Sequence, residues 1–430
     1  MSQSLTVQPP FRSSLISRRR FQLIGALFVS AIVPYLIRTF LYPETRDVST
    51  INSFVGNAVA VILGLWGRLS MGNYPGVRSS ALNFPTATIG HAVVLTAILL
   101  LRVSYDRAGL LGGYALHLLW LFFVYFSLQR VSRRPIGIVP YGAVNKLVSI
   151  EQIKWVRLAE PSLERSSHCE AIVADFGADL PANWEAFLAE SALNGRLVYQ
   201  VKQLSESLTG RVEIEHISEN SFGSLVPGRG YFYVKELADF ILAIMLLPIF
   251  VIVVALVAIA IRSEGPGSIY FRQRRVGFGG VPIEVVKFRT MIPLGQRDPA
   301  VDRDGATTSH RDPRITRVGA FLRRTRLNEL PQILNVLRGE MSWIGPRPEA
   351  DVPSSLNKGE VPFYAYRQVV KPGISGWAAV NQGHVADIED IRLKLEYDFY
   401  YIKYFSFWLD VLIVFRTIRT VMTCSRFSRR

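Results

Sequence analysis

The sequence predicts a membrane-anchored protein of several domains: four transmembrane helices, a small Rossmann-like α/β domain, a re-entrant membrane helix and a C-terminal α+β domain. Two observations predict this class. Long apolar segments lie in the first third of the chain and again after its middle, and strand and helix patterns alternate between them. The composition agrees, because 49% of the 430 residues are hydrophobic and only 19% are charged, whereas soluble proteins usually carry about 25% charged residues.

We expect five parts along the chain. Residues 1–18 form a tail, 19–130 the transmembrane helices, 131–230 the cytosolic α/β domain, 231–262 the re-entrant helix and 263–430 the C-terminal domain. The formal net charge of +15 favours anionic lipid or phosphate as a partner. The two cysteines, Cys169 and Cys424, can build neither a disulfide framework nor a zinc cluster.

The first apolar segment, residues 21–42, would be about 33 Å long as a helix and can cross a hydrocarbon core of roughly 30 Å. It has no small-residue cleavage site, so we expect a retained anchor. Segments 51–66, 88–101 and 110–128 follow, and the first two of these are short enough to be a hairpin or a core helix instead. Arginines before the first segment and after the fourth predict that both ends of the bundle are cytoplasmic.

A fifth apolar segment, residues 237–261, has Pro248 at its middle. Proline has no N–H for the carbonyl of Ile244 and its ring crowds the preceding turn, so the helix should kink there. Basic residues flank both ends, which favours keeping both on the cytoplasmic side. We therefore predict a re-entrant helix. The alternative is a fifth full span, which would place everything after Arg262 outside the cell.

The middle of the chain predicts an α/β domain. Residues 136–140 and 170–176 predict strands, 183–201 a helix followed by a strand, and 211–217 a further strand. A dinucleotide site would need a G-x-G-x-x-G turn after the first strand, which is missing, and Tyr141 and Lys146 are not spaced as a Y-x-x-x-K pair. The pattern favours a structural or regulatory domain over cofactor chemistry.

Positive charge concentrates between Arg262 and Arg347, where 16 basic residues stand against 8 acidic ones. This stretch has no interleaved stacking aromatics and no recognition motif, which argues against nucleic acid. It favours phosphorylated small molecules and anionic lipid, with a solvated basic face near a membrane as the alternative. Within it, Lys287 and Arg289 lie two apart in a predicted strand and should face one side, where they can grip a diphosphate.

A helix is predicted from Asn328, a favoured N-cap residue, with Pro331 in its first turn. Glu329 then lies at a helix N-terminus, where a carboxylate can hold Mg²⁺ together with substrate phosphates. Prolines on both sides of Arg347 fix the backbone, so that its guanidinium points in a defined direction for binding phosphate.

Five motifs follow one another in the last half of the chain: FRQRRVG, KFRTM, NELPQILNVLRGEMSWIGPRP, KPGISGW and YDFYY. On these motifs the chain resembles the long-form bacterial monotopic phosphoglycosyl transferases, the polyprenyl-phosphate sugar-phosphate transferases that initiate exopolysaccharide synthesis. The resemblance implies transfer of a hexose 1-phosphate from a UDP-sugar to undecaprenyl phosphate, release of UMP and a requirement for Mg²⁺. It also implies a catalytic domain on the cytoplasmic face of the bacterial inner membrane, in contact with the lipid bilayer, and a possible homodimer.

The resemblance implies roles for particular residues. The candidate catalytic residues are Asn328, Glu329, Lys287 and Asp398, with Glu329 as the metal ligand. The candidate substrate-binding residues are Arg289, Arg347, Arg274 and Arg275.

One position departs from the family pattern. Asn328 stands where the family has an aspartate that forms a covalent phosphosugar intermediate, and an amide is a poor nucleophile. Three interpretations stay open: Asn328 preserves the fold but silences the chemistry; the chain reacts through another carboxylate, such as Asp312, or by direct attack of the lipid phosphate; or the amide deamidates. Ala379 also stands where a glutamine is expected. The alternative functions are a catalytically silent scaffold or regulator of a polysaccharide assembly complex, and a nucleotide-sugar dehydratase.

The last apolar segment, residues 406–423, predicts an amphipathic helix. Trp408, Leu412, Phe415 and Ile418 should share one side, which favours a helix lying on the bilayer surface. A helix buried against the C-terminal domain is the alternative.

Overall fold

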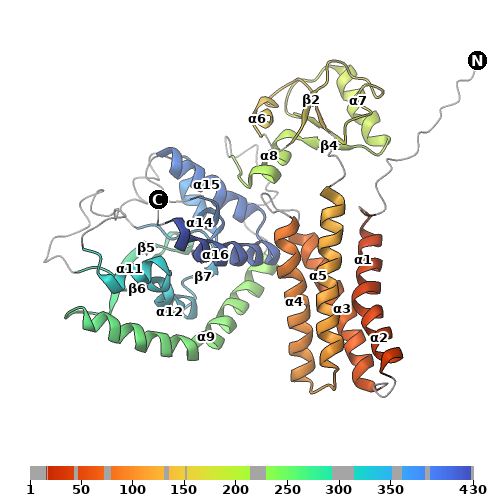
Figure 1. The fold of residues 1–430 in the computed structure, drawn as a ribbon. Helices are drawn as coiled ribbons and strands as arrows, with labels where there is room; N and C mark the ends of the chain where they lie inside the picture. The colour runs from red at the N-terminus through yellow and green to blue at the C-terminus, as the bar shows by residue number, and fades with distance from the viewer. Residues whose placement is uncertain are drawn as a thin grey trace, which may run out of the picture. The chain divides into compact units, whose positions relative to one another are not determined.

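The computed structural model describes residues 16, 18–42, 47–71, 79–129, 135–150, 153–213, 229–292, 314–350, 361–382 and 388–427 (Figure 1). The chain divides into two compact units, Met1–Gly210 and Arg211–Arg430. By length and composition, 5 helices of the described residues are able to cross a membrane, and the last of them, Gly230–Ser263, belongs to the second unit.

The first unit begins with apolar helices. The helix α1 (Arg19–Leu27), the π-helical turn η2 (Phe28–Ile32) and α2 (Val33–Leu41) run on from one another, and α3 (Val48–Met71), α4 (Ser79–Leu100) and α5 (Arg107–Gln129) follow. Segment 51–66 lies within α3, and segment 88–101 lies within α4 except for its last residue, so a hairpin is wrong for both. A Cβ on Gly90 would lie 2.5 Å from the carbonyl oxygen of Ala60, so a small residue is required where α3 and α4 meet.

The α/β part of the first unit contains a parallel sheet of strand order β2-β1-β3-β4. Its strands are β1 (Ile136–Ile138), β2 (Trp155–Arg157), β3 (Ala171–Ala174) and β4 (Leu197–Gln200), and its helices are α6 (Asn145–Val148), α7 (Ala182–Leu193) and α8 (Val201–Thr209). Successive β3 residues point to opposite faces, so Ile172 packs against α7 and Val173 packs against α6 and α8. The predicted α/β fold is present.

Two details of that prediction are wrong. Strand β2 was not predicted, and residues 211–213 are not a strand because the backbone N–H of Val212 donates to the carbonyl of Glu396 instead of to a neighbouring strand. Residues 214–217 lie outside the described part of the chain. The missed strand is three residues long, too short for an alternating pattern to be recognised.

Asp175 directly follows β3, at the carboxyl end of the strands, where an open parallel sheet usually binds ligands. Asp175 accepts hydrogen bonds from the backbone N–H groups of Ala143 at 2.9 Å and Gly177 at 3.1 Å. Gly142 has φ +74, and a Cβ there would lie 2.4 Å from the Asp175 carboxylate. Asp175 thus accepts hydrogen bonds from backbone N–H groups of the kind that would otherwise bind a phosphate.

The second unit begins with α9 (Arg229–Ser263), an apolar helix of 35 residues with Pro248 inside it. Figure 1 shows that α9 changes direction along its length, as the missing N–H of a proline predicts. Both halves of α9 pack on the same domain: Ala243 and Phe250 contact one core cluster, and Val257 and Ile261 contact another. Large apolar side chains on the other side of α9 are exposed, including Leu237, Ile241, Met245, Ile252, Leu256 and Ile259.

The rest of the second unit surrounds a β-hairpin and a two-stranded parallel sheet. The hairpin is β5 (Tyr270–Val276) and β6 (Pro282–Phe288), and the parallel pair is β7 (Ser342–Ile344) and β8 (Gly373–Ser375). The helical elements are α11 (Arg317–Arg324), the 3-10 segments η6 (Leu327–Gln332) and η7 (Tyr364–Val369), α12 (Ile333–Leu337), α14 (Trp377–Asn381), α15 (Ile388–Lys403) and α16 (Phe407–Phe427).

The helix α16 is partly buried against the C-terminal domain, which was the alternative to a helix lying on the bilayer surface. Leu409, Leu412 and Ile413 are buried, whereas Phe407 and Ile418 are at least half exposed. The predicted grouping of Leu412 with Ile418 on one side is therefore wrong. One face of α16 packs on the domain, and the apolar residues of the other face remain available to lipid.

Candidate functional site

The hairpin of β5 and β6 places two basic side chains on one face. Lys287 pairs with Phe271 across the hairpin and Arg275 pairs with Ile283. Because side chains alternate along a strand, Lys287 and Arg275 share a face, and Arg274, which is exposed, lies on the opposite face. The structure thus brings Arg275 to Lys287 but does not bring Arg274 to it.

Glu329 lies at the first turn of the helical segment that follows α11, as predicted, but the turn is built differently. The segment begins as the 3-10 helix η6 at Leu327, and its N-cap residue is Arg326, with φ 59. The prediction that Asn328 is the N-cap is wrong, because the backbone N–H of Glu329 donates to the carbonyl of Arg326 at 3.1 Å and no side-chain cap is made. This tight turn carries the Glu329 side chain into the interior.

Glu329, which is buried, forms an ion pair with the partly exposed Arg347. The Arg347 Nη2 atom lies 2.6 Å from Glu329 Oε1, and Arg326 Nη1 lies 3.7 Å from the same oxygen. Burial alone would raise the pKa of Glu329, but Arg347, Arg326 and Lys287 lower it to about 2. The carboxylate is therefore ionised at every physiological pH.

Lys287 has the opposite electrostatic environment. Burial and the nearby positive charges of Arg275, Arg347 and Arg323 lower the pKa of Lys287 to about 7, against the attraction of Glu329. Arg275, Arg347 and Arg323 thus lie near Lys287, while Lys287, Arg347 and Arg326 lie near the carboxylate of Glu329. Such an excess of positive charge in a buried place favours an added anion.

The backbone around Arg347 is held from two directions. Arg275 Nη1 donates to the carbonyl of Pro348 at 2.6 Å, and Arg367 Nη2 donates to the carbonyl of Arg347 at 2.9 Å. A small cavity beside this segment is lined in part by Gly277, Arg347, Glu349 and Arg367. The predicted orientation of Arg347 by its flanking prolines is therefore reinforced by two arginines.

Asp398 lies in α15, where it is 1% exposed and pairs with Arg367 at 2.7 Å. Arg367 also pairs with Glu349 at 3.2 Å, and Lys394 forms a close ion pair with Glu349. Burial raises the pKa of Asp398, and Arg367 and Lys394 oppose that rise. Asp398 thus contacts the group that holds the carbonyl of Arg347. The sequence analysis missed Arg367, Glu349 and Lys394, and no motif spacing singled them out.

Arg289 lies outside the cluster around Lys287. Strand β6 ends at Phe288, so the alternation that would place Arg289 beside Lys287 no longer applies. The Arg289 guanidinium instead donates to the carbonyls of Pro266 at 2.8 Å and Gly265 at 3.0 Å, just after the end of α9. The structure gives Arg289 the role of closing the C-terminal turn of α9.

Asn328 is adjacent to Glu329 in η6. Its Oδ1 atom is buried and, within the described residues, accepts no hydrogen bond. Ala379 is exposed on α14. Asp312, the other candidate nucleophile, lies outside the described residues.

The described residues contain no group of three or more His, Cys, Asp or Glu side chains able to hold a metal ion. Mg²⁺, however, usually binds one or two carboxylates and takes its other ligands from phosphates and water. Glu329 supplies a carboxylate, and Asn328 Oδ1 is a buried oxygen whose hydrogen-bonding capacity is unused. These residues fit a divalent cation that is bound together with substrate phosphates.

Comparison with known proteins defines the class. Residues 230–424 match the family model described as bacterial sugar transferase. The chain is 41% identical over 382 residues to an Aeromonas hydrophila protein, UDP-N-acetylgalactosamine-undecaprenyl-phosphate N-acetylgalactosaminephosphotransferase, with 88% of this chain and 89% of the relative covered. The chain therefore belongs to the bacterial sugar transferase family and is a phosphoglycosyl transferase of the kind that initiates exopolysaccharides and related glycans.

Other relatives match less than half of the chain. The UDP-glucose:undecaprenyl-phosphate glucose-1-phosphate transferase of Escherichia coli K12 is 41% identical over 186 residues, which cover 43% of this chain and 39% of the relative. The protein of the same name in Caulobacter vibrioides is 39% identical over 191 residues, which cover 44% and 70%. The predicted family is confirmed, and nothing in these relatives favours a silent scaffold.

The Asp398–Arg367 pair predicts a stability effect. Asp398→Asn or Arg367→Met breaks a buried ion pair, which costs about 3–5 kcal/mol, and should lower the melting temperature of the purified protein by roughly 5–15 °C. The double variant Arg367→Met/Asp398→Leu should lose less than the two single variants together, since no charge of that pair is left unpaired.

Glu284→Gln is the control, because it removes an ion pair with Arg272 that is largely exposed and should change the melting temperature by less than about 2 °C. If Asp398→Asn melted like the parent protein and lost only activity, Asp398 would have a directly catalytic role instead.

Proposed function

We propose that this chain transfers a hexose 1-phosphate from a UDP-sugar to undecaprenyl phosphate and releases UMP, as the initiating step of exopolysaccharide synthesis. The observation that carries the proposal is the cluster of Lys287, Arg275, Arg323 and Arg347, of which Lys287 and Arg347 lie beside Glu329. A diphosphate and a lipid phosphate both supply the negative charge that this cluster lacks. The printed names of the relatives, which act on UDP-sugars and undecaprenyl phosphate, support the same substrates.

The proposal includes a membrane arrangement. Residues 19–130 form four spans, 131–230 the cytosolic α/β domain, and 263–430 the catalytic domain on the cytoplasmic face of the inner membrane. Helix α9 enters the bilayer and returns. The packing of both of its halves on the catalytic domain supports this, because a helix that crossed the membrane would carry one half away from that domain. Its exposed apolar residues supply a surface for lipid.

We infer the following chemistry. An oxygen of the lipid phosphate attacks the sugar-bearing phosphorus of the UDP-sugar, the bond from this phosphorus to the bridging oxygen breaks, and UMP leaves with the electron pair. Arg347 and Lys287 bind the phosphate oxygens on which charge is concentrated. Asn328 is no nucleophile, so the lipid phosphate attacks directly and no phosphosugar is attached to the protein.

Mg²⁺ is proposed as the cofactor, held by Glu329 and Asn328 Oδ1. When bound, it would neutralise diphosphate charge and polarise the phosphorus–oxygen bond. The protein's own contribution is to bury the Glu329 carboxylate and to keep it ionised beside Arg347.

The reaction is tested by following UMP release in lipid nanodiscs with Mg²⁺ and either UDP-N-acetylgalactosamine or UDP-glucose. The chain as it stands should release UMP only when undecaprenyl phosphate is present. Asn328→Asp, which restores the carboxylate of the family, should in addition release about one UMP per protein without the lipid, and a phosphosugar adduct should appear in its intact mass.

The control is Glu329→Gln in both backgrounds, which should abolish release. Were neither the parent nor Asn328→Asp to release UMP with any UDP-hexose, the transferase proposal would be wrong for this sequence. UMP release by the parent without the lipid would overturn direct attack.

The lowered pKa of Lys287 predicts pH-dependent binding. A bound diphosphate raises the Lys287 pKa above its free value of about 7, so the protein should take up a proton on binding at pH 8. Affinity for the UDP-sugar should therefore be highest below pH 7 and fall as the pH rises through it, by up to about tenfold per pH unit. Calorimetry in buffers of different ionisation enthalpy measures the uptake.

Lys287→Arg keeps the charge but does not titrate in this range, and it should remove the proton uptake. Lys371→Met changes a lysine outside the cluster and should retain it. Equal affinity of the parent protein at pH 6 and pH 9 would contradict the assignment of Lys287.

The membrane arrangement predicts where each end of α9 lies. A reporter enzyme active only in the periplasm should be inactive when fused after Arg430, because α9 returns to the cytoplasmic face. The same reporter fused after Ser104, between α4 and α5, should be active and serves as the control. Periplasmic activity after Arg430 would show that α9 crosses the membrane.

A further inference from the structure

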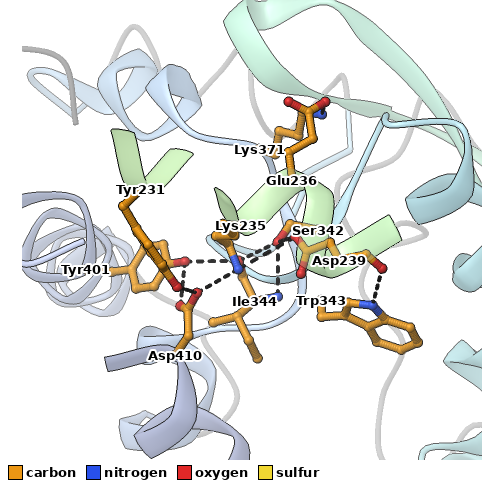
Figure 2. Close-up of polar contacts among 10 residues, drawn as sticks. All are labelled: Tyr231, Lys235, Glu236, Asp239, Ser342, Trp343, Ile344, Lys371, Tyr401 and Asp410. Atoms are coloured by element: carbon orange, nitrogen blue, oxygen red, sulfur yellow. Dashed lines mark hydrogen bonds and ion pairs between the residues drawn. The ribbon is translucent and has the colours of Figure 1, made fainter. Parts of the chain in front are cut away.

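A second buried polar network lies where α9 begins, apart from the cluster around Glu329 (Figure 2). Asp410 of α16 is its centre: Lys235 Nζ lies 2.7 Å from Asp410 Oδ2, and the Tyr231 hydroxyl donates to the same oxygen at 2.7 Å. Lys235 lies 3.7 Å from a second carboxylate, Asp239. Lys235 and Asp410 are each 8% exposed. Charges are placed in such an apolar setting only when they are paired.

The network ends on one backbone atom, the carbonyl oxygen of Ile344. The Tyr401 hydroxyl lies 3.0 Å from this oxygen and 2.9 Å from Asp410 Oδ1. The Ser342 hydroxyl lies 2.9 Å from the same carbonyl and 2.5 Å from Asp239 Oδ2. Each hydroxyl has one proton and two acceptors within hydrogen-bond distance. The hydrogen bond that it donates is therefore shared between a carboxylate oxygen and the Ile344 carbonyl oxygen. Burial raises the pKa of Tyr401 well above its usual value, so its proton stays in place.

Ile344 is the last residue of β7, and only Gly345 and Pro346 separate it from Arg347. The next backbone N–H, of Gly345, donates to the carbonyl of Ser375 at 2.8 Å. A Cβ on Gly345 would lie 2.3 Å from the carbonyl oxygen of Lys371, so the segment has no room to move toward β8. The proline that follows limits the backbone further. A displacement at the Ile344 carbonyl is therefore passed on to Arg347.

We propose that Tyr401 and Asp410 are positioning residues for the transfer: with Lys235 and Ser342 they fix the Ile344 carbonyl against α9, and through it they set the direction of the Arg347 guanidinium. The inference rests on the proposed function in assigning phosphate binding to Arg347. It also connects the membrane helix to the reaction centre, because Tyr231, Lys235 and Asp239 all belong to the first turns of α9.

The network joins four elements. Tyr231, Lys235 and Asp239 come from α9, Ser342 and Ile344 from β7, Tyr401 from α15 and Asp410 from α16. The Trp343 Nε1 atom also donates to the backbone carbonyl of Asp239 at 3.1 Å. This hydrogen bond joins a side chain of β7 to the main chain of α9. An apolar contact would permit sliding between these elements, whereas directional hydrogen bonds select one register.

The experiment combines hydrogen exchange with kinetics on the full-length protein in nanodiscs. Tyr401→Phe removes one hydroxyl and no charge, so it leaves no buried charge unpaired. It should speed backbone exchange in peptides covering residues 341–350 at least threefold, and lower kcat/KM about tenfold. In an Arg347→Lys background, which already lacks bidentate phosphate binding, the same change should lower kcat/KM less than about twofold.

Glu236→Gln is the matched control, because Glu236 lies on the same turn of α9 and pairs with Lys371 near the same sheet (Figure 2), but makes no contact with Ile344 within the described residues. It should leave both the exchange of 341–350 and kcat/KM unchanged within about twofold. Asp410→Asn should reproduce the exchange effect of Tyr401→Phe, and the melting temperature of each variant identifies any general loss of folding.

Unchanged exchange at 341–350 in Tyr401→Phe would overturn the proposal. So would an equal loss of kcat/KM in the parent and Arg347→Lys backgrounds, which would mean that Tyr401 acts independently of Arg347. Exchange needs no turnover, so a parent protein that released no UMP would overturn the proposed reaction, while the exchange rates would still decide whether Tyr401 and Asp410 hold the Arg347 segment.

Discussion

The pair between the buried Glu329 and Arg347 is the interaction on which the proposed reaction centre depends. This carboxylate offsets part of the repulsion among the nearby positive charges of Lys287, Arg275, Arg323 and Arg347. Each partner is brought to the pair by a separate device: a left-handed residue, Arg326, turns Glu329 inward, and Arg367 and Arg275 hold the backbone around Arg347. The pair leaves positive charge in excess, which is the property that the proposed phosphate substrates would satisfy.

Much of this architecture follows from sequence because its causes are local. Apolar length predicts the helices of the first unit, Pro248 predicts the bend of α9, and alternating runs predict the strands of the α/β domain. The position of Glu329 at a helix start follows from Pro331 and the apolar spacing after it. The N-cap residue does not follow from the sequence. The segment begins at the backbone carbonyl of Arg326, a left-handed residue, and the Asn328 side chain makes no cap.

The remaining features depend on contacts between distant segments. Arg289 is two residues from Lys287, yet the strand ends between them and the C-terminal turn of α9 offers carbonyls that bind its guanidinium. Asp398 belongs to a motif of the family, but only the fold shows that it contacts Arg367 and not the Glu329 cluster. Arg367 carries no sequence signal, and Tyr401 belongs to the YDFYY motif, but only the fold shows that it contacts Asp410 and the Ile344 carbonyl.

The packing of both halves of α9 on one domain has a consequence for the membrane. A helix that crosses a bilayer must match its hydrophobic length to the bilayer thickness, and tilts or distorts lipid where the two differ. In the proposed arrangement α9 does not extend to the opposite surface of the bilayer. The depth of the Glu329 cluster relative to the lipid headgroups therefore depends on the bend of α9 and on the Lys235–Asp410 ion pair. The reaction centre would then stay at the level of a lipid phosphate in thin and thick membranes alike, while the helices of the first unit adjust to each.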